Sequence, residues 1–409
     1  MDHELKKRRV GILGGGQLSL MLAQAAVRLG LKPIVFVEDS YAPAAQDHTE
    51  AVLGSVNDEN DLRHFFSQVD LVIFENEFIN CEIVEKVSQE KRIPCWPKLP
   101  VISQLQDKLN QKMLLDSLKI PTSPYRVLEL SEDFSEAMVQ SQIQQVQKEW
   151  GGSCVLKWAR MGYDGKGVFF LSESLGASPS LYSFLRDGVK AQGRIYAEKW
   201  VPFERELAVI GVYSTQKEFL AYPLVVSEQK NGICHRVYGP ADLFGVTPHV
   251  EKQAQEYAQK VAQAVGLTGA FALEFFMTRD AELLVNEIAP RVHNSGHYTQ
   301  NACATDQFEN HWRAVLGLPL GEVRPQAAFG MLNVLGPENS NLLENRPRFA
   351  LPRPSRRSHV HWYGKRSLRA GRKMGHINGV ASSGDEIRSL LNELDQCYRE
   401  WVQQEKEVL

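Results

Sequence analysis

The sequence predicts a chain of mixed α/β and α+β class, with an N-terminal α/β domain, a central α+β domain and a small C-terminal β-rich domain. Three observations support this class. A strand, glycine turn, helix and strand follow one another over residues 9–37. A glycine-rich segment follows a strand that ends at Lys157, and an apolar strand from residue 283 runs into Asn286 and Glu287. The length of 409 residues allows two or three domains, each with its own core.

Composition and charge limit the class of protein. The chain is 43% hydrophobic and 23% charged, as in an ordinary globular protein, and its net charge of −3 gives no reason to expect nucleic acid as a partner. The six cysteines are scattered without a C-x-x-C pair, which is typical of reduced thiols in the cytosol. Residues 1–9 are charged, and no apolar run approaches the length of a membrane span. We therefore expect a cytoplasmic protein that binds neither membrane nor nucleic acid.

The chain begins with a predicted βαβ unit. Residues 9–13 form a strand, Gly14–Gly16 a tight turn, residues 17–29 a helix and residues 33–37 the next strand. The dinucleotide-binding pattern needs glycine at positions 14, 16 and 19, and position 19 is serine. Free backbone N–H groups at the start of the helix can still hold a phosphate. A NAD(P)-dependent oxidoreductase stays open as an alternative, although no hydride-transfer site is recognisable.

Two further features complete the first domain. A strand over residues 69–74 runs into Glu75-Asn76-Glu77, at the carboxyl end where ligands collect in open α/β sheets. A solvated loop explains these acidic residues equally well. The proline-rich segment at residues 94–100 interrupts the alternation of helices and strands, so we place the first domain at residues 1–100.

Helices are expected over residues 103–118, 133–150 and 250–265. The last of these carries apolar residues on one face and ends at Gly266, which is typical of core packing. Near the end of the chain, a capping box at residues 383–386 precedes apolar residues at helical spacing up to Trp401. This helix is expected to cover the C-terminal domain.

The central segment carries features of phosphate binding. Lys157 ends a strand and could reach a nucleotide phosphate, and three glycines within residues 162–167 could fold over phosphates, with Lys166 neutralising them. A plain glycine hairpin is the alternative, but Tyr163-Asp164 is not typical of one. Glu198 and Glu206 flank an apolar strand-to-loop transition that would suit adenine and ribose.

A pair of carboxylates predicts a metal site. Glu274 is embedded in an apolar strand over residues 269–276, where a lone carboxylate is costly. A hairpin then returns the chain through Glu287, so two adjacent antiparallel strands would place the carboxylates side by side. Oxygen ligands beside phosphate favour Mg²⁺, with Asn286 as a neutral ligand. The basic and hydrogen-bonding loop that follows, with Arg291, His293 and Asn294, adds an anion site beside the metal site.

Taken in order, these motifs resemble those of ATP-grasp ligases. The matching features are Lys157, residues 162–167, Glu198-Lys199-Trp200-Val201, Glu206, Glu274 and Asn286-Glu287. The stretch from Asn286 to His297 is similar to that of N5-carboxyaminoimidazole ribonucleotide synthetases. Further matches lie at residues 14–18, 307–313, 361–365 and 371–376, so the resemblance covers about residues 8–380.

The resemblance implies a fold and a reaction. It implies a Rossmann-like pre-ATP-grasp domain at residues 1–100, an ATP-grasp domain at 101–322 with a lid subdomain near 122–200, and a C-terminal domain with a terminal helix at 323–409. It also implies a cytosolic homodimer that uses ATP and Mg²⁺. The implied reaction carboxylates 5-aminoimidazole ribonucleotide with bicarbonate through carboxyphosphate, releasing ADP and phosphate in purine biosynthesis.

The resemblance also implies residue roles. ATP would be bound by Lys108, Lys157, Gly162, Tyr163, Asp164, Gly165, Lys166, Gly167, Val168, Glu198, Lys199, Trp200, Val201, Glu206, Gln229, Asn286 and Glu287. Mg²⁺ would be held by Glu274 and Glu287. The acceptor and the carboxylating species would be surrounded by Asp164, Arg291, His293, Asn294 and Lys365. The phosphate of the acceptor would be held by Gly15, Gln17, Arg372 and Lys373.

Some positions depart from the family pattern. Met161 stands where a second glycine is common before the loop, Ser19-Leu20 replace Gly-Arg, Gln229 replaces a histidine, and Lys108 replaces an arginine. Alternatives within the superfamily are a formate-dependent glycinamide ribonucleotide transformylase and a biotin carboxylase, which should lack the Arg291–His297 loop. A non-catalytic nucleotide-binding relative is disfavoured because all three expected metal and phosphate ligands, Glu274, Asn286 and Glu287, are present.

Overall fold

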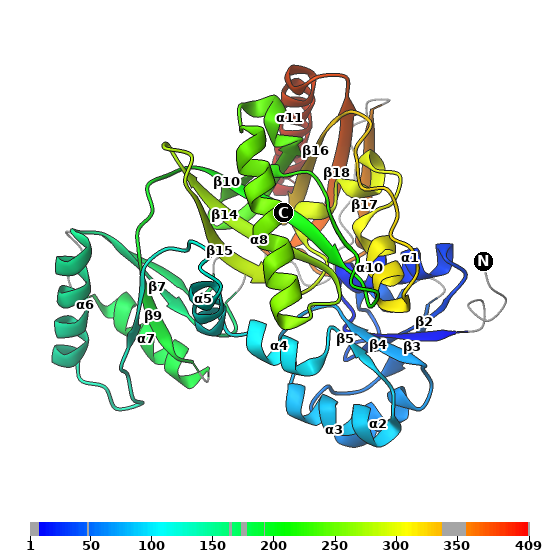
Figure 1. Cartoon of the computed structure of the whole chain (residues 1–409), viewed down its shortest axis with the longest axis horizontal. Helices are drawn as coiled ribbons and strands as arrows, with labels where there is room; N and C mark the ends of the chain where they lie inside the picture. The colour runs from blue at the N-terminus through cyan, green and yellow to red at the C-terminus, as the bar shows by residue number, and fades with distance from the viewer. Residues whose placement is uncertain are drawn as a thin grey trace.

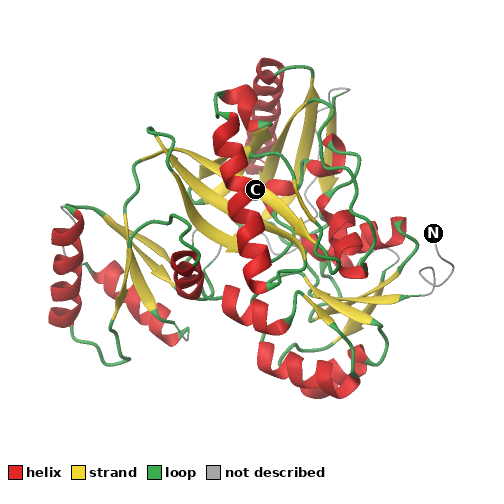
Figure 2. Ribbon diagram, in the orientation of Figure 1, coloured by secondary structure: helices red, strands yellow, loops and turns green. Residues whose placement is uncertain are grey.

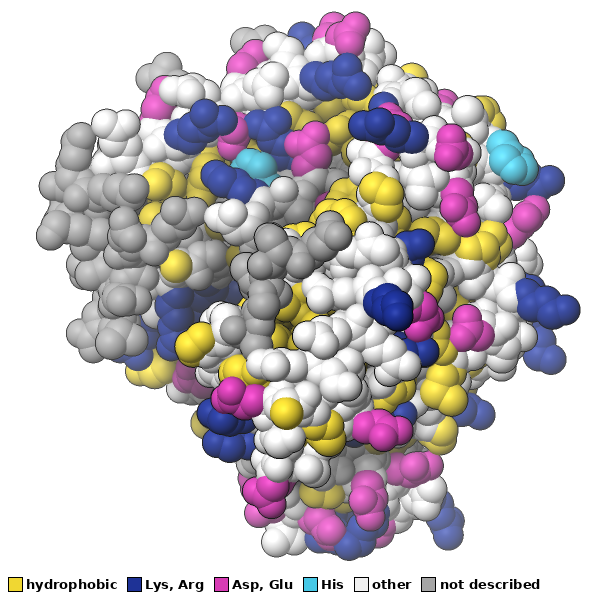
Figure 3. Space-filling model, turned by 90° about the vertical axis from the view of Figure 1, so that its left-hand side faces the viewer, with side chains coloured by type: hydrophobic (Ala, Val, Ile, Leu, Met, Phe, Trp, Pro, Cys, Tyr) yellow, Lys and Arg dark blue, Asp and Glu magenta, His cyan; other side chains and the backbone are white. Residues whose placement is uncertain are grey.

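A computed structural model describes residues 8–46, 49–162, 166–172, 178–191, 193–337 and 357–407, with side chains up to residue 403 (Figure 1). Three sheets organise these residues, and each sheet lies in a different part of the molecule (Figure 2). Within the described residues, no helix is long and apolar enough to cross a bilayer. On the face shown in Figure 3, acidic and basic side chains are interspersed.

The N-terminal sheet is parallel throughout the described residues. Its strand order is β3 (Glu50–Leu53), β2 (Lys32–Val37), β1 (Arg9–Leu13), β4 (Leu71–Phe74) and β5 (Cys95–Trp96). Helix α1 (Gln17–Arg28) packs on one face, and helices α2 (Glu59–Phe66) and α3 (Cys81–Lys91) pack on the other. Since both faces are covered, the central strands are apolar along their whole length, as in other parallel sheets. The expected βαβ unit is confirmed.

A small antiparallel sheet forms the lid subdomain, which projects to the left in Figure 1. Its strand order is β6 (Tyr125–Leu128), β9 (Ile195–Lys199), β7 (Cys154–Trp158) and β8 (Val168–Leu171). Helices α6 (Glu136–Trp150) and α7 (Pro179–Lys190) cover it and share a core with it. This core is a distinct cluster, and a smaller cluster of Leu109, Ala159 and Tyr196 packs the sheet against the residues that precede it.

The largest sheet is antiparallel and contains strands from both sides of residue 323, where the C-terminal domain was expected to begin. Its path within the described chain is β15 (Leu283–Ala289), β14 (Gly269–Thr278), β10 (Phe203–Tyr213), β12 (Val225–Lys230), β13 (Ile233–Gly239), β16 (Ala328–Leu335), β18 (Lys373–Ala381) and β17 (Ser358–Trp362), while β11 (Phe219–Ala221) pairs with β10. Helices α8 (Pro248–Val265) and α11 (Gly384–Glu407) contribute to a core cluster that contains residues from both sides of position 323. The C-terminal strands therefore extend the central sheet.

Shorter helices connect these parts. The helix expected at residues 103–118 is instead two helices, α4 (Leu99–Leu105) and α5 (Lys108–Ser117). The break has a local cause, because the Asp107 carboxylate accepts hydrogen bonds from the N–H groups of Leu109 and Asn110 and so starts a new helix. Helices α9 (Thr299–Ala302) and α10 (Gln307–Leu316) follow β15, and Trp312 on α10 donates from Nε1 to the Leu22 carbonyl of α1 at 2.8 Å. This contact joins the N-terminal domain to the central sheet.

Candidate active site

The expected carboxylate pair is formed by the β14–β15 hairpin. Glu274 and Glu287 are direct cross-strand neighbours, which confirms that they lie side by side. Burial, together with the charges of Glu287 and Glu206, raises the pKa of Glu274 to about 7 against the opposing charges of Lys108 and Lys373. Burial also raises the pKa of Glu206, on the adjacent strand β10, to about 7. The three carboxylates thus lie on the neighbouring strands β10, β14 and β15.

Lysines approach this carboxylate cluster from two other elements. Lys108, at the start of α5, places Nζ 2.8 Å from Glu287 Oε2. Lys157, on the lid strand β7, donates to Asn286 Oδ1 at 3.0 Å. The structure therefore brings together the expected ligands of the phosphates and the metal from the lid, α5 and β15. Such a mixture of cations and acidic oxygens is suited to a phosphoryl group and its counter-ion.

Glu198 lies in a different environment from the one expected. Its carboxylate is buried and lies 2.7 Å from the ammonium of Lys112 and 2.8 Å from that of Lys157. Burial by itself would raise its pKa, but the charges of Lys157 and Lys112 outweigh burial and lower the pKa to about 2. The side chain of Glu198 is thus engaged by lysines, which leaves the following segment, Lys199 to Val201, as the part of the expected hinge that can face a base.

An aromatic cluster lies beside this hinge. Trp200 is 42% exposed and packs edge-on against Phe170 of the lid strand β8, with ring centroids 4.9 Å apart. Its ring also lies 6.2 Å from that of Phe203, which stacks on Phe276. An exposed aromatic surface at a hinge between two subdomains is a suitable surface for a planar base.

The glycine-rich segment is described in part. Gly162, Lys166, Gly167 and Val168 belong to the described residues, whereas the expected site residues Tyr163, Asp164 and Gly165 lie outside them. Gly167 has a φ of +72°, and a Cβ there would lie 3.1 Å from the Cα of Gly162, so the two ends of the segment approach closely. Val168 is 43% exposed at the start of β8.

Arg291 pairs with an acidic residue of the N-terminal domain. Its Nε lies 2.5 Å from Glu77 Oε2, and its Nη2 lies 3.3 Å from Glu77 Oε1. Glu77 is 5% exposed, so the segment after β4 is part of the site and is not a solvated loop. This forked contact places the N-terminal domain next to the loop that follows β15.

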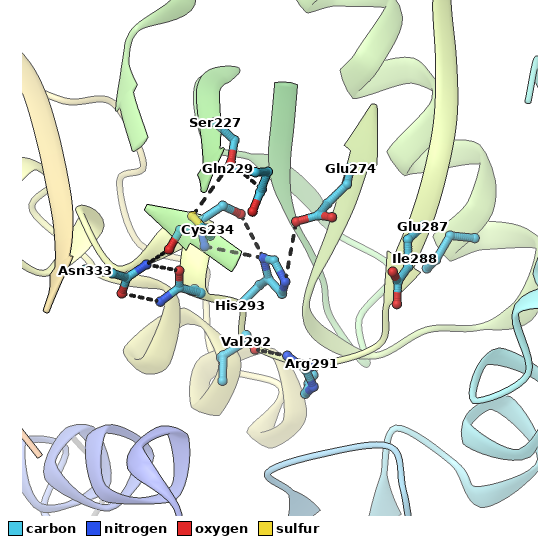
Figure 4. Close-up of polar contacts among 12 residues, drawn as sticks. Ser227, Gln229, Cys234, Glu274, Glu287, Ile288, Arg291, Val292, His293 and Asn333 are labelled. Atoms are coloured by element: carbon cyan, nitrogen blue, oxygen red, sulfur yellow. Dashed lines mark hydrogen bonds and ion pairs between the residues drawn. The ribbon is translucent and has the colours of Figure 1, made fainter. Parts of the chain in front are cut away.

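His293 faces the carboxylate cluster. Its Nε2 lies 3.7 Å from Glu274 Oε1, while its Nδ1 lies 2.9 Å from Ser295 Oγ (Figure 4). Burial lowers the pKa of His293 well below its usual value, and the charges of Arg291 and Lys373 lower it further. The imidazole is therefore neutral near pH 7 and can accept or donate one hydrogen bond at each nitrogen, according to its tautomer.

Asn294 follows His293 in the chain, but its side-chain hydrogen bonds are made to Asn333 and not to the carboxylate cluster. Its Nδ2 donates to Asn333 Oδ1 at 3.0 Å, and Asn333 Nδ2 donates back to Asn294 Oδ1 at 2.6 Å (Figure 4). Asn333 on β16 also donates to the Cys234 carbonyl at 2.8 Å. Both amides are buried. The structure thus places Asn294 in a reciprocal pair that joins the loop after β15 to the C-terminal part of the large sheet.

The N-terminal glycine turn faces a carboxylate. The N–H of Gly16 donates to Glu75 Oε2 at 2.6 Å, and a Cβ on Gly16 would lie 2.0 Å from Glu75 Oε1. Glycine is required here because the carboxylate approaches the backbone so closely. Gly15 packs against Val37, and Gln17 starts helix α1.

The side chain of Ser19 explains how the turn tolerates this departure from the family pattern. It is buried, and its hydroxyl donates to the Gly14 carbonyl at 2.8 Å. The hydroxyl thus satisfies an acceptor of the turn itself.

The expected basic residues of the C-terminal part, Lys365, Arg372 and Lys373, have different neighbours. Lys365 Nζ lies 5.5 Å from the ring centroid of Tyr363, and its charge lowers the pKa of Glu75 against the effect of burial. Arg372 donates to the Ser367 carbonyl at 3.1 Å. Lys373 begins β18, and its charge affects the pKa of Glu274 and of His293. Gln229, on β12, donates to Ser227 Oγ at 3.1 Å.

Several residues of the site were missed at the level of the sequence. The rings of His376 and His361, on the neighbouring strands β18 and β17, stack with centroids 4.5 Å apart, and the ring centroid of His297 lies 4.7 Å from that of His376. Tyr363 hydroxyl lies 2.7 Å from His376 Nδ1. Lys112 was also missed, although its spacing of one helical turn from Lys108 was a signal that could have identified it.

Comparisons with known proteins agree with this geometry. Three family models match the chain: a ribonucleotide synthetase preATP-grasp domain at residues 7–106, an ATP-grasp domain at 113–308, and a phosphoribosylaminoimidazole carboxylase C-terminal domain at 330–390. The chain is 36% identical over 387 residues to the N5-carboxyaminoimidazole ribonucleotide synthase of Synechocystis sp., covering 91% of this chain and 92% of that protein. It is 35% identical over 403 residues to the phosphoribosylaminoimidazole carboxylase of Ogataea methanolica, covering 96% of this chain and 70% of the longer fungal protein.

A solved structure shows the same arrangement. The N5-carboxyaminoimidazole synthase of Aspergillus clavatus, crystallised with ADP and 5-aminoimidazole ribonucleotide, superposes with a TM-score of 0.81 at 31% identity, covering 97% of this chain and 100% of that one. The likeness includes all three parts of the molecule that meet at the carboxylate cluster. The chain belongs to the N5-carboxyaminoimidazole ribonucleotide synthase family of ATP-grasp proteins.

Proposed function

We propose that this chain carboxylates the amino group of 5-aminoimidazole ribonucleotide with bicarbonate, at the expense of ATP, to give N5-carboxyaminoimidazole ribonucleotide, ADP and phosphate. The observation that carries the proposal is the meeting of the Glu274–Glu287 pair with Lys108 and Lys157 on one side and with Arg291 on the other. The first side suits nucleotide phosphates, and the second suits an anionic acceptor. The Aspergillus relative was crystallised with ligands of both kinds.

The residues present fit Mg²⁺. Glu274 is a half-buried carboxylate next to Glu287, and its pKa is raised by burial and by the charges of Glu287 and Glu206, which a divalent cation would offset. Both ligands supply hard oxygens, which Mg²⁺ prefers, and we propose that they hold it, with Asn286 close by. When bound, the ion would offset charge on the phosphates of the nucleotide.

The side chains divide the chemistry between two partial reactions. A bicarbonate oxygen attacks the γ-phosphorus of ATP, the bond to the β-phosphate oxygen breaks, and ADP leaves with carboxyphosphate formed. We propose that Lys108 and Lys157 hold the phosphates during this step, because their ammonium groups lie against Glu287 and Asn286, respectively. The amine then takes the carboxyl carbon, inorganic phosphate leaves, and one proton is lost from nitrogen.

The acceptor side has its own proposed ligands. Arg291 is held rigidly by Glu77, and neutral His293 can hydrogen-bond an uncharged amine or a carboxyl oxygen. We propose that Lys365, Arg372 and Lys373, with Gly15 and Gln17, hold the acceptor and its phosphate. The hinge at residues 199–201 and Glu206 would take adenine and ribose, and the glycine segment would close over the nucleotide and exclude water.

Asp164 is proposed to orient the acceptor amine or take its proton. We expect Asp164→Asn to lower product formation by at least about tenfold, since a general base typically contributes more than this. Product would be measured by chromatography at saturating ATP. Product formation at nearly the rate of the unchanged chain would exclude the role.

Release of ADP tests the proposed activity. We expect ADP to form rapidly when ATP, Mg²⁺, bicarbonate and 5-aminoimidazole ribonucleotide are all present, and slowly when the acceptor or bicarbonate is omitted. A chain that releases ADP with formate and glycinamide ribonucleotide instead would be a transformylase, and one that binds only a nicotinamide nucleotide would contradict the ligase assignment.

We also propose a homodimer, on the family resemblance alone. Sedimentation equilibrium at micromolar concentration, giving the mass of one chain, would contradict it.

A further inference from the structure

Lys112 is a buried lysine behind the phosphate side of the site. It lies one turn after Lys108 on α5, and its side chain is 1% exposed. Its ammonium lies 2.7 Å from Glu198 Oε1, 2.6 Å from Thr122 Oγ1 and 2.9 Å from Ser123 Oγ. The ammonium thus donates hydrogen bonds to two hydroxyls, while its contact with Glu198 Oε1 is an ion pair without hydrogen-bond geometry. A lysine is rarely buried to this extent unless it is paired, so the pairing needs an explanation.

The partner of Lys112 is itself shared with a second lysine. Glu198 Oε2 lies 2.8 Å from Nζ of Lys157, and Lys157 also donates to Asn286 Oδ1 at 3.0 Å. Lys112, Glu198, Lys157 and Asn286 therefore form a continuous chain from the back of α5 to the end of β15. Burial would raise the pKa of Glu198, but the two ammonium groups lower it to about 2, so the carboxylate stays charged.

The charges in this chain favour an anion at its open end. Two lysines and one carboxylate leave one positive charge, and the exposed member is Lys157 with 11% of its side chain accessible, against 1% for Lys112. Without Lys112, the Lys157–Glu198 pair would be neutral, and the carboxylate would bind Lys157 alone. Lys157 would then be less available to a phosphate group.

We propose that Lys112 is a positioning residue of the nucleotide site, which acts through Glu198 to keep Lys157 aligned and to offset the negative charge of Glu198. The inference rests on the proposed function, because it takes the phosphates of a nucleotide as the ligand of Lys157. It adds a residue that need not touch the nucleotide, since Glu198 separates Lys112 from Lys157 in the chain of contacts.

A purely structural role is the competing explanation. Thr122, which accepts from Lys112, also donates to the Val285 carbonyl at 2.6 Å, so Lys112 could serve only to tie α5 to β15. If Lys112 has only this structural role, its replacement lowers the stability of the chain, and any change in nucleotide affinity is the same whether or not Glu198 is present. The two explanations therefore differ in the coupling between Lys112 and Glu198.

A double-mutant cycle on the full chain distinguishes the positioning role of Lys112 from the purely structural role. Binding of ADP with Mg²⁺ would be measured by titration calorimetry for the unchanged chain, Lys112→Met, Glu198→Gln and the double variant. We expect Lys112→Met to raise the Kd roughly tenfold in the original background and by less than about twofold in the Glu198→Gln background. Lys119→Met is the matched control, because Lys119 is an exposed lysine just past the end of α5, and it should leave the Kd unchanged.

Each outcome decides between the explanations. An equal effect of Lys112→Met in both backgrounds, or a lower melting temperature with unchanged Kd, overturns the proposal. If Lys112→Met does not fold, the double variant replaces the buried pair, which proteins often tolerate. It should then bind ADP as Glu198→Gln does, and weaker binding overturns the proposal. Failure of the unchanged chain to bind ADP would contradict the proposed function itself.

Discussion

Glu274 is a half-buried carboxylate whose ionisation is opposed by its surroundings. Its pKa is raised to about 7 from an ordinary value of 4.5, so the folded chain binds a proton that the unfolded chain releases between these values. The stability penalty is absent below pH 4.5, grows as the pH rises and is complete above about pH 7. A site that is unfavourable without its ligand is typical of functional centres.

Replacing Glu274 tests both the pH-dependent stability penalty and the proposed role of this carboxylate in binding Mg²⁺. We expect Glu274→Gln to stabilise the ligand-free chain at pH 8 by roughly 1–3 kcal/mol and to have little effect on unfolding at pH 4.5. The same change should abolish Mg²⁺-dependent ADP release. Urea unfolding at both pH values and the ADP assay measure these effects, with Glu256→Gln on the exposed face of α8 as the control. Equal stability changes at both pH values would contradict the assignment.

Substitutions in the Asn294–Asn333 pair distinguish a structural role of Asn294 from a role in binding the acceptor. Removing Asn333 takes away both hydrogen bonds of the buried Asn294 amide, and removing Asn294 leaves the Asn333 carbonyl oxygen without this partner, so Asn294→Ala and Asn333→Ala should each cost about 1–3 kcal/mol in the free energy of unfolding. We expect similar, small changes in the KM of the acceptor for both variants. A large increase in KM for Asn294→Ala alone would show that Asn294 contacts the acceptor directly.

At the scale of elements, the start of the glycine segment contains a strained residue. Met161 has a φ of +61°, in the left-handed region that glycine adopts at no steric cost. Its side chain is 48% exposed, so packing does not compensate for the strain. The departure from the usual glycine is therefore a change in the backbone at the base of the lid.

A pair of substitutions isolates this strain. Met161→Ala keeps the Cβ and its conflict with the carbonyl oxygen, whereas Met161→Gly removes both. We expect Met161→Gly to be more stable than Met161→Ala by up to about 1 kcal/mol, the steric cost less the entropy that glycine gains on unfolding. Chemical denaturation measures the difference. If Met161→Ala is the more stable variant, the left-handed conformation carries no strain.

The elements differ in how far the sequence could predict them. The β14–β15 hairpin was predictable because its apolar residues, turn and carboxylates lie within about twenty positions. Partners that are distant in the chain were not: Glu77 and Arg291 are 214 residues apart, and Asn294 and Asn333 are 39 apart. The helix break at Asp107 was missed because a capping aspartate inside an apolar pattern resembles an ordinary surface residue.

At the scale of the whole molecule, the site is formed where all parts meet. The lid supplies Lys157, the large sheet supplies the carboxylates, and the N-terminal domain supplies Glu77 to hold Arg291. The C-terminal strands continue the same sheet and bring Lys373 to its edge of the cluster. The groups proposed for phosphoryl transfer and for carboxylation therefore lie next to one another, and closure over them would protect an unstable acyl phosphate from water.

Transfer of labelled oxygen from bicarbonate tests this account most directly. Bicarbonate enriched in ¹⁸O would be mixed with ATP, Mg²⁺, 5-aminoimidazole ribonucleotide and the full chain, and the phosphate released early in the reaction would be analysed by mass spectrometry. If bicarbonate attacks the γ-phosphorus, each phosphate should carry one oxygen from bicarbonate, in step with formation of the N-carboxylated product. Phosphate that carries oxygen from water alone would contradict the account, because ATP would then be hydrolysed without activating bicarbonate.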